Sequence, residues 1–481
     1  MSAPSLNRLI PQIIRKMYLE MNGQTRFLLM FLLSLLVGCG KAEQRTLTFH
    51  DQIREDLQQY HDGVLEAWAY VDSKKNEQSV DLTAARDRLL ARVEDSATPE
   101  HFALLLQEFA ASLQDGHSSA STSSLGEPFP NSWPIGVLLV KEGIIVANLN
   151  WLTKNPGIQL GDRLIRVNEQ PVESYLQSRM AVTTASTELA RKVLAVDSLH
   201  RTSEKQVRLT LEHLDGSQYE ADLPCLPHQI DYRQQTRSRF CTHKQLDDQI
   251  GVIRIPQFTW NEKAFLESKA DRDLDAPLRE AKDQIDEAFA AVQKCSAIIL
   301  DLRNNAGGYE LLSTYVAEHL VPGDFTYHST ERRDSKLIRS LEQFQKLEDS
   351  YFGRPIPQHP RAWKGFRHFD GTPFEGELIV LINPRCFSTT DNLCAFLKDV
   401  RPRTRFVGRP TQGGTGEPTT VFTLRHSGVP VQFCISRIYS PEGRLIEGTG
   451  TQPDIEVQPA REDLLANHDP DMEVAVKLLK N

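Results

Sequence analysis

At 481 residues, the chain is too long for one ordinary hydrophobic core, and two to four domains are expected. Its 40% apolar and 25% charged residues are typical of a folded globular protein, which excludes a disordered or membrane-embedded chain. The formal net charge of -9 argues against nucleic acid as a partner, because no basic stripe offsets the repulsion of phosphates.

The start of the chain predicts an export signal. Basic residues precede an apolar run over residues 27–37, which is shorter than the ~20 residues that a membrane-spanning helix needs. The run ends in Leu-Val-Gly-Cys at positions 36–39, which resembles a bacterial lipobox; a plain signal with a chance cysteine is the alternative. The resemblance implies a signal peptide over residues 1–39 and lipidation of Cys39. It also implies a location on the periplasmic face of a bacterial membrane, and Gly40 favours the outer membrane.

Apart from Cys39, the chain has six cysteines. An exported protein can oxidise them, but six cysteines allow 15 complete pairings and the sequence does not choose among them. No CxxC pair and no His/Cys cluster has the spacing of metal ligands, so the sequence implies no metal and no other cofactor. The six are Cys225, Cys241, Cys295, Cys386, Cys394 and Cys434.

Residues 48–125 predict a helical domain. Apolar residues recur at three- and four-residue spacing between Phe102 and Leu113, and Thr98 and Pro99 form a helix start. The helix ends at the turn Gln-Asp-Gly-His over positions 114–117, and a serine-rich loop follows over 118–124.

Residues 130–228 predict a β-rich domain, with strands at 135–139, 143–146 and 207–211. Gly161 and Asp162, followed by a strand that ends in Val167 and Asn168, resemble a PDZ domain in its circularly permuted bacterial form. The resemblance implies that an extended peptide binds near Gly161 and Asp162 by adding a strand to a sheet edge. Any small β-domain with a Gly-Asp turn is the alternative.

Strands and helices alternate over residues 245–460, which predicts an α/β core. Residues 297–302 and 378–382 are apolar runs typical of strands buried on both faces, and 281–294 is an amphipathic helix. Residues 309–377 contain one helical section and a Pro- and aromatic-rich section, a candidate lid over the site. Two alternating strands at 420–424 and 429–435 and a C-terminal helix within 461–481 complete the chain.

Two loops at strand ends carry the candidate chemistry. Residues 301–308 read Asp-Leu-Arg-Asn-Asn-Ala-Gly-Gly, and the paired glycines allow a sharp turn that aims backbone N–H groups outward. Ser388 begins a helix after the second buried strand; a serine there is either an N-cap, in a capping box with Asp391, or a nucleophile favoured by the helix dipole.

These two motifs resemble those of the C-terminal-processing and tricorn-type serine peptidases. The resemblance implies a peptidase core of the ClpP/crotonase-like class, Ser388 as the nucleophile, and an oxyanion hole from the amide of Gly308 (or Gly307) and that of Thr389. One branch of the family uses a lysine base about 25 residues after the serine. This chain has Arg409 there, which does not deprotonate, and Lys398 lies nearly three helical turns from Ser388.

The tricorn-like branch instead uses a histidine and a glutamate. Leu-Gln-Asp-Gly-His-Ser at 113–118 and the segment 445–454 resemble its motifs, which implies His117 as the general base and Glu447 as the residue that orients it. Gly116 stands where tricorn has a serine of its relay. Asp115 is an alternative partner for His117, but its place in the turn favours a turn or cap role.

The sequence therefore predicts an α+β and α/β multidomain protein, and the resemblance implies a serine endopeptidase or C-terminal-processing peptidase that acts on polypeptides of the periplasm and envelope. Two alternatives remain: a catalytically inactive ligand-binding protein on the same fold, and a PDZ-bearing scaffold that binds peptides. The substrate and the oligomeric state are not predicted.

Overall fold

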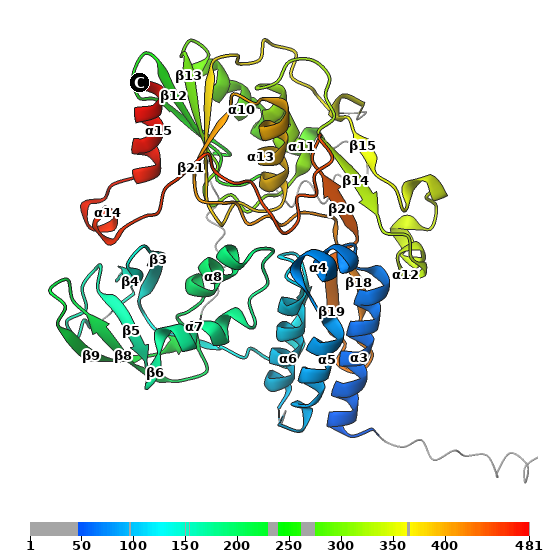
Figure 1. Ribbon diagram of the computed structural model, residues 1–481, viewed down its shortest axis with the longest axis vertical. Coiled ribbons are helices and arrows are strands. Elements are labelled where there is room, and N and C mark those ends of the chain that lie inside the picture. Colours follow the sequence, from blue (N-terminus) through cyan, green and yellow to red (C-terminus); the bar gives the residue numbers. More distant parts are fainter. Residues whose placement is uncertain are drawn as a thin grey trace, which may run out of the picture. The chain divides into compact units, whose positions relative to one another are not determined.

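The computed structural model describes residues 47–95, 98–149, 151–152, 154–228, 239–260, 275–362 and 366–480 (Figure 1). The signal peptide and Cys39, predicted within residues 1–39, lie outside this part. Every site residue discussed below belongs to one compact unit, Gln52–Asn481. No helix of the described residues is long and apolar enough to cross a membrane.

Four helices open the described chain: α3 (Phe49–Ala67), α4 (Val71–Gln78), α5 (Leu82–Leu90) and α6 (Pro99–Ser112). Thr98 caps α6 as predicted, its hydroxyl accepting the amide of His101. The apolar faces of these helices share one core with the hairpin of β18 (Pro418–Thr423) and β19 (Pro430–Cys434). The core includes Tyr60 and Phe109 from the helices and Phe433 from β19. The helical segment is therefore completed by strands from the far end of the sequence.

The β-rich segment forms a sheet in the order β3-β4-β5-β8-β9. Its strands are β3 (Gly136–Val140), β4 (Gly143–Asn148), β5 (Arg163–Val167), β8 (Gln206–Glu212) and β9 (Gln218–Pro224), and β6 (Gln170–Pro171) pairs with β5. Helices α7 (Val172–Met180) and α8 (Glu188–Asp197) pack against the same apolar core, α8 beside the edge strand β3.

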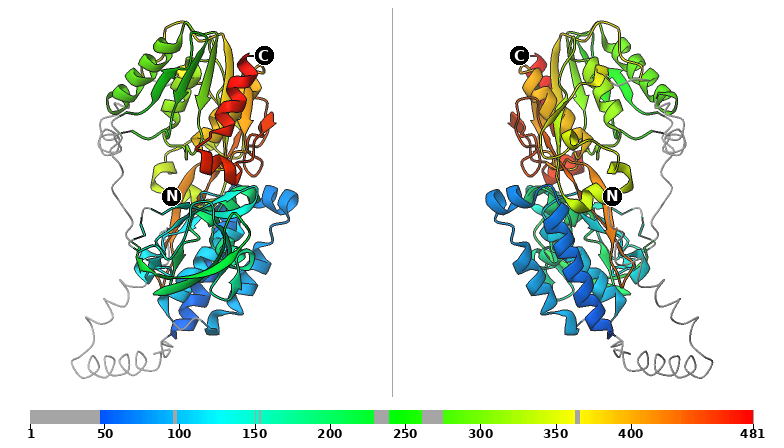
Figure 2. Two further views of the ribbon diagram at one scale, coloured as in Figure 1. Left: turned by 90° about the vertical axis from the view of Figure 1, so that its left-hand side faces the viewer. Right: turned by 90° about the vertical axis from the view of Figure 1, so that its right-hand side faces the viewer.

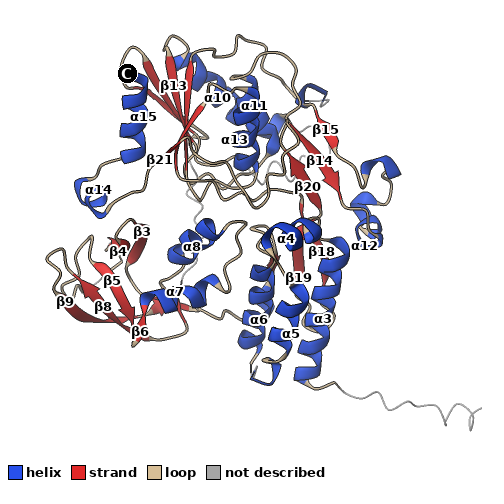
Figure 3. Cartoon of the chain, viewed as in Figure 1, coloured by secondary structure: helices blue, strands red, loops and turns tan. Residues whose placement is uncertain are grey.

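The remaining core is a six-stranded sheet in the order β11-β12-β13-β16-β17-β21. Figure 3 labels two of its strands, β13 and β21. All neighbours are parallel except the edge pair β11–β12. The strands are β11 (Thr242–Gln245), β12 (Ile250–Arg254), β13 (Ala297–Asp301), β16 (Glu377–Ile382), β17 (Arg405–Gly408) and β21 (Ile455–Glu456).

Helices cover both faces of this sheet (Figure 2). Helices α10 (Arg279–Val292), α11 (Glu310–Glu318) and α13 (Thr389–Val400) pack on one face, and α15 (Pro470–Lys480) on the other. Strands β13 and β16 are parallel neighbours, so the loops that follow them meet at one edge of the sheet.

The segment 309–377, predicted as a possible lid, contributes to packed structure. Its helix α11 is buried against the core, and β14 (His328–Arg332) pairs with both β15 (Ile356–Gln358) and β20 (Ser436–Tyr439). The serine-rich loop 118–124 likewise contains β1 (Ser119–Ala120), which pairs with β19. The other short elements are β2 (Asn131–Ser132), β7 (Arg201–Thr202), β10 (Leu226–Pro227), α12 (Lys336–Ser340) and α14 (Arg461–Ala466).

Candidate active site

Ser388 sits at the sharp turn between β16 and α13. Its φ is +60°, a conformation that non-glycine residues seldom adopt and that marks strain held by the surrounding structure. Its own amide donates to the carbonyl of Gly414. The capping-box interpretation is wrong: the Ser388 side chain makes no cap hydrogen bond, and Asp391 accepts the amides of Gly413 and Gly414 instead.

The hydroxyl of Ser388 meets the imidazole of His117. Nε2 of His117 lies 3.1 Å from Oγ of Ser388, although 271 residues separate them in the sequence. The ring also stacks on Phe387 with a centroid distance of 4.2 Å. Burial lowers the pKa of His117 below its ordinary 6.5, which favours the neutral imidazole that a general base requires.

Of the backbone amides predicted to bind the oxyanion, one already has a hydrogen-bond acceptor. The amide of Gly307 already donates to Oδ1 of Asn305 at 2.9 Å, which corrects the assignment of Gly307 as a donor. Within the described residues, no acceptor is recorded for the amides of Gly308 and Thr389. Gly307 has φ +88°, and a Cβ there would lie 2.8 Å from Cβ of Ser388. Its role is therefore to let the two loops approach each other.

Glu447 is not placed as the resemblance implied. Its Oε1 forms a buried ion pair of 2.8 Å with Nζ of Lys74 on α4, and its Oε2 accepts the amide of Thr415 at 3.0 Å. Among the described residues, His117 is not a recorded partner of Glu447; the carboxylate recorded beside Nδ1 of His117 belongs to Asp115, at 4.0 Å. Burial raises the pKa of Glu447 to about 7, and Lys74 opposes that rise.

Lys74 was missed because its helix, Val-Asp-Ser-Lys-Lys-Asn-Glu-Gln, reads as a solvent-exposed polar segment. The side chain is only 2% exposed, and its ammonium donates to the carbonyls of Gln114 and Ser186 as well as pairing with Glu447. Two lysines in a polar helix give no sequence signal that distinguishes the buried one.

The β-rich segment contacts both catalytic loops. Oγ of Ser186 accepts the amide of Gly116 at 3.0 Å, and Arg385, three residues before Ser388, forms a two-pronged ion pair with Asp197 of α8. A Cβ at Gly116 would lie 2.7 Å from the Phe387 ring. A serine at this position would therefore require the Phe387 ring to shift.

Gly161 and Asp162, the predicted peptide-binding residues, form the turn before β5. Gly161 has φ +85°, and the buried Asp162 carboxylate accepts the hydroxyl of Tyr219 and the amide of Gln159. These contacts hold the sheet together, so a direct role in peptide binding stays a prediction. All six cysteines of the described chain are buried free thiols.

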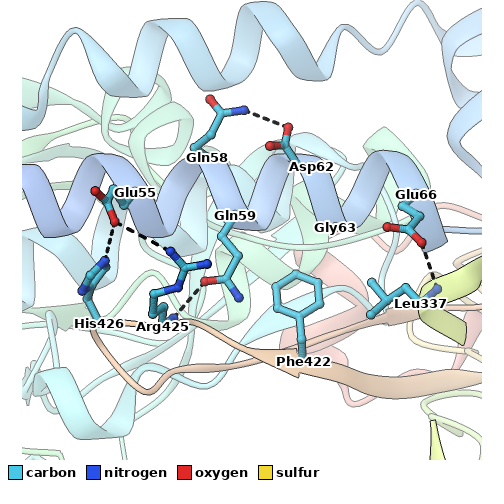
Figure 4. Close-up of a pocket in the computed structure, with 10 residues that line it drawn as sticks. All are labelled: Glu55, Gln58, Gln59, Asp62, Gly63, Glu66, Leu337, Phe422, Arg425 and His426. Carbon is cyan, nitrogen blue, oxygen red and sulfur yellow. Dashed lines mark hydrogen bonds and ion pairs between the residues drawn. The ribbon is translucent and has the colours of Figure 1, made fainter. Parts of the chain in front are cut away.

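A separate groove runs along α3 and is lined by residues of that helix, by Leu337 of α12 and by the β18–β19 hairpin (Figure 4). Its cavity measures about 560 Å³. Phe422 forms an apolar floor, while Glu55 binds both Arg425 and His426 at one end. The groove contains neither Ser388 nor His117.

Part of this chain is similar in sequence to known peptidases. Residues 249–457 match the model of Peptidase family S41. A Carboxy-terminal-processing protease of Bartonella bacilliformis is 26% identical over 215 residues, 44% of this chain and 40% of that protein. The chain therefore matches less than half the length of this relative.

Two solved structures share the fold over nearly their whole length. Mature CPAF has a TM-score of 0.69 at 16% identity, with 90% of this chain and 97% of that chain covered. Mature CPAF complexed with lactacystin has a TM-score of 0.68 at 16% identity, with coverages of 90% and 98%. The match to the Peptidase family S41 model is thus confined to residues 249–457, which include Ser388 and Glu447 but not His117.

Proposed function

We propose that this chain hydrolyses peptide bonds in polypeptides of the bacterial envelope, with Ser388 as nucleophile and His117 as general base. The observation that carries the proposal is the 3.1 Å contact between Nε2 of His117 and Oγ of Ser388 at a strained strand-to-helix turn. This is hydrogen-bonding distance for proton transfer from a nucleophile to its base.

The reaction follows from these positions. Oγ of Ser388 attacks the scissile carbonyl as its proton passes to Nε2 of His117, and the imidazolium then gives that proton to the leaving amine. The amides of Gly308 and Thr389 flank the nucleophile and hold the oxyanion, helped by the N-terminal end of α13. Water then attacks the acyl-enzyme ester, again with His117 accepting and returning the proton, which releases the acyl group and restores the Ser388 hydroxyl.

The β-rich segment is proposed to act as a PDZ-like domain that captures a substrate segment. Its edge strand β3 lies beside α8, an arrangement in which a peptide can add as a further strand. The Arg385–Asp197 pair and the Ser186–Gly116 hydrogen bond join this segment to both catalytic loops. Binding there is therefore proposed to position the substrate and to adjust the catalytic loops.

Lipidation of Cys39 is proposed to anchor the protein at the periplasmic face of the membrane, the outer membrane being favoured. The support is the basic and apolar N-terminal pattern that ends in the Leu-Val-Gly-Cys segment. Radiolabelled palmitate should enter the wild-type protein in bacterial cells and not a Cys39→Ser variant; equal labelling of both would refute the anchor.

The test of the peptidase is cleavage of an unfolded polypeptide by the purified protein. Wild type should cut it, whereas Ser388→Ala and His117→Ala should not, with the folded state of each variant checked by circular dichroism. Full cleavage by Ser388→Ala would reject the assignment. Binding without cleavage by wild type would favour the ligand-binding or scaffold alternatives.

A further inference from the structure

The imidazole of His117 has one nitrogen engaged and one without a partner. Nε2 contacts Ser388, so Nδ1 must carry the hydrogen when Nε2 accepts the serine proton. Nδ1 is buried and makes no hydrogen bond in the described part of the chain. The N–H group at Nδ1 can form a hydrogen bond only if an acceptor moves toward it. Once Nε2 is also protonated, the whole ring is a positively charged imidazolium.

Asp115 supplies the carboxylate that faces this nitrogen. Its Oδ1 lies 4.0 Å from Nδ1, about 1 Å beyond a hydrogen bond. Neutral donors fix the carboxylate: the indole of Trp68 and the hydroxyl of Ser118 each donate to Oδ2 at 2.9 Å, and the amide of His117 donates to Oδ1 at 2.9 Å. The turn role predicted for Asp115 is therefore present, and it orients the acid toward the ring.

Within the described residues, no lysine or arginine forms an ion pair with Asp115. Lys74 is paired with Glu447, and His117 is the recorded ion-pair partner of Asp115 among the described residues. Burial raises the pKa of Asp391 to about 8, so that this acid is largely neutral at pH 7. Among the described residues, Asp115 also interacts with Tyr60, Tyr70, Cys434 and Glu447, none of which is cationic.

We propose that Asp115 is the positioning residue whose negative charge stabilises the His117 imidazolium during catalysis, and that Glu447 serves as the counter-ion of Lys74. This deepens the proposed function and rests on it. The proton moves from Oγ of Ser388 to Nε2 of His117 and on to the leaving amine. Asp115 takes up no proton in either step, and its carboxylate faces the hydrogen on Nδ1.

The electrostatic effect is large enough to measure. At an effective dielectric constant of about 20, unit charges 4.0 Å apart change a pKa by up to roughly three units. Asp115→Asn should therefore lower the pKa of His117 by at least about one unit. The acidic limb of the kcat/KM profile should move to lower pH by the same amount, while the plateau falls ~100-fold or more because the imidazolium loses its counter-charge.

The experiment compares pH profiles of wild type, Asp115→Asn and Glu447→Gln. Ser118→Ala and Trp68→Phe are the matched controls, since each removes one hydrogen bond to Asp115 and leaves its charge. In a Ser388→Ala background, ¹⁵N-histidine NMR gives the pKa of His117 without any need for activity. Cys434→Ser is the second variant if Asp115→Asn does not fold. The hydroxyl of the new serine donates to Oδ1 of Asp115 in competition with His117, and it should lower the pKa of His117 by a few tenths of a unit.

A downward shift in Asp115→Asn, with little shift in the two controls, supports the proposal. An unchanged pKa of His117 in Asp115→Asn (or in Cys434→Ser, where only that variant folds) overturns it, whatever happens to the plateau. A larger shift in Glu447→Gln than in Asp115→Asn also overturns it. If wild type cleaves nothing while NMR shows the shift, the proposed function fails and the charge coupling stands.

Discussion

Replacement of Lys74 by methionine tests whether the buried ion pair with Glu447 keeps that carboxylate charged. Both side chains are at most 2% exposed, and the 2.8 Å separation corresponds to about 6 kcal/mol of attraction at an effective dielectric constant of about 20. Desolvation offsets much of this energy, and removal of one partner of a buried pair typically destabilises a protein by 3–5 kcal/mol.

The pH dependence is the sharper signature. In the folded wild type, the pKa of Glu447 is about 7, against an ordinary 4.5. Because the folded state holds the proton more tightly, this group makes stability fall as pH rises from about 4.5 to 7, after which its contribution is constant. Without Lys74, Glu447 stays protonated to higher pH, so that stability continues to fall by about 1.4 kcal/mol per pH unit above 7.

The assay is urea unfolding of wild type and Lys74→Met at pH 6 and pH 8.5. The destabilisation caused by the substitution should be about 2 kcal/mol larger at pH 8.5 than at pH 6, as the pKa of about 7 requires. Lys75→Met, at the exposed neighbouring position, is the matched control, and a Lys74→Met/Glu447→Gln double variant should lose the extra pH dependence. An equal destabilisation at both pH values would refute the account of this pair.

Three further predictions concern the loops around the nucleophile. Gly307→Ala should abolish peptide cleavage, because its Cβ would lie 2.6 Å from the carbonyl oxygen of Phe387 at a φ of +88°; normal activity in a folded variant would contradict this. Arg385→Ala should lower kcat/KM several-fold while changing the free energy of unfolding by less than about 1 kcal/mol, since its ion pair with Asp197 is partly exposed; the opposite pattern in activity assays and urea titrations would be inconsistent. Burial raises the pKa of Asp391 from 3.8 to about 8, so this acid lowers the stability of wild type as pH rises between those values. Asp391→Asn lacks the titrating group and should therefore gain stability relative to wild type as pH rises from 4 to 8. A stability difference between the two proteins that does not change with pH in unfolding experiments would count against this prediction.

Much of the architecture follows from local pattern. The continuous apolar runs predicted the buried strands β13 and β16, and the amphipathic spacing after Thr98 predicted α6. The loops at the carboxyl ends of those strands then locate Ser388 and the glycine pair. The position of His117 beside Ser388 came only from a motif resemblance, because no local property of a turn specifies a partner 271 residues away.

The remaining features depend on tertiary contacts, which produce no repeating pattern in the sequence. Lys74 and its exposed neighbour Lys75 are chemically identical, and only the packing of α4 decides which is buried. Glu447 was assigned by resemblance, yet its partner in this chain is that lysine. Likewise, the Gly307 amide is occupied because Oδ1 of the Asn305 side chain accepts it, a contact that the sequence does not predict.

The central claim is that Ser388 is an activated nucleophile and His117 its base. Labelling the purified protein from Lys41 onward with a fluorophosphonate tests it most directly, with Ser388→Ala and His117→Ala as controls. The contact of 3.1 Å between Nε2 and Oγ predicts that wild type is labelled and that both variants lose the label. Labelling that persists in Ser388→Ala, or a wild-type protein that does not react at all, would contradict the claim.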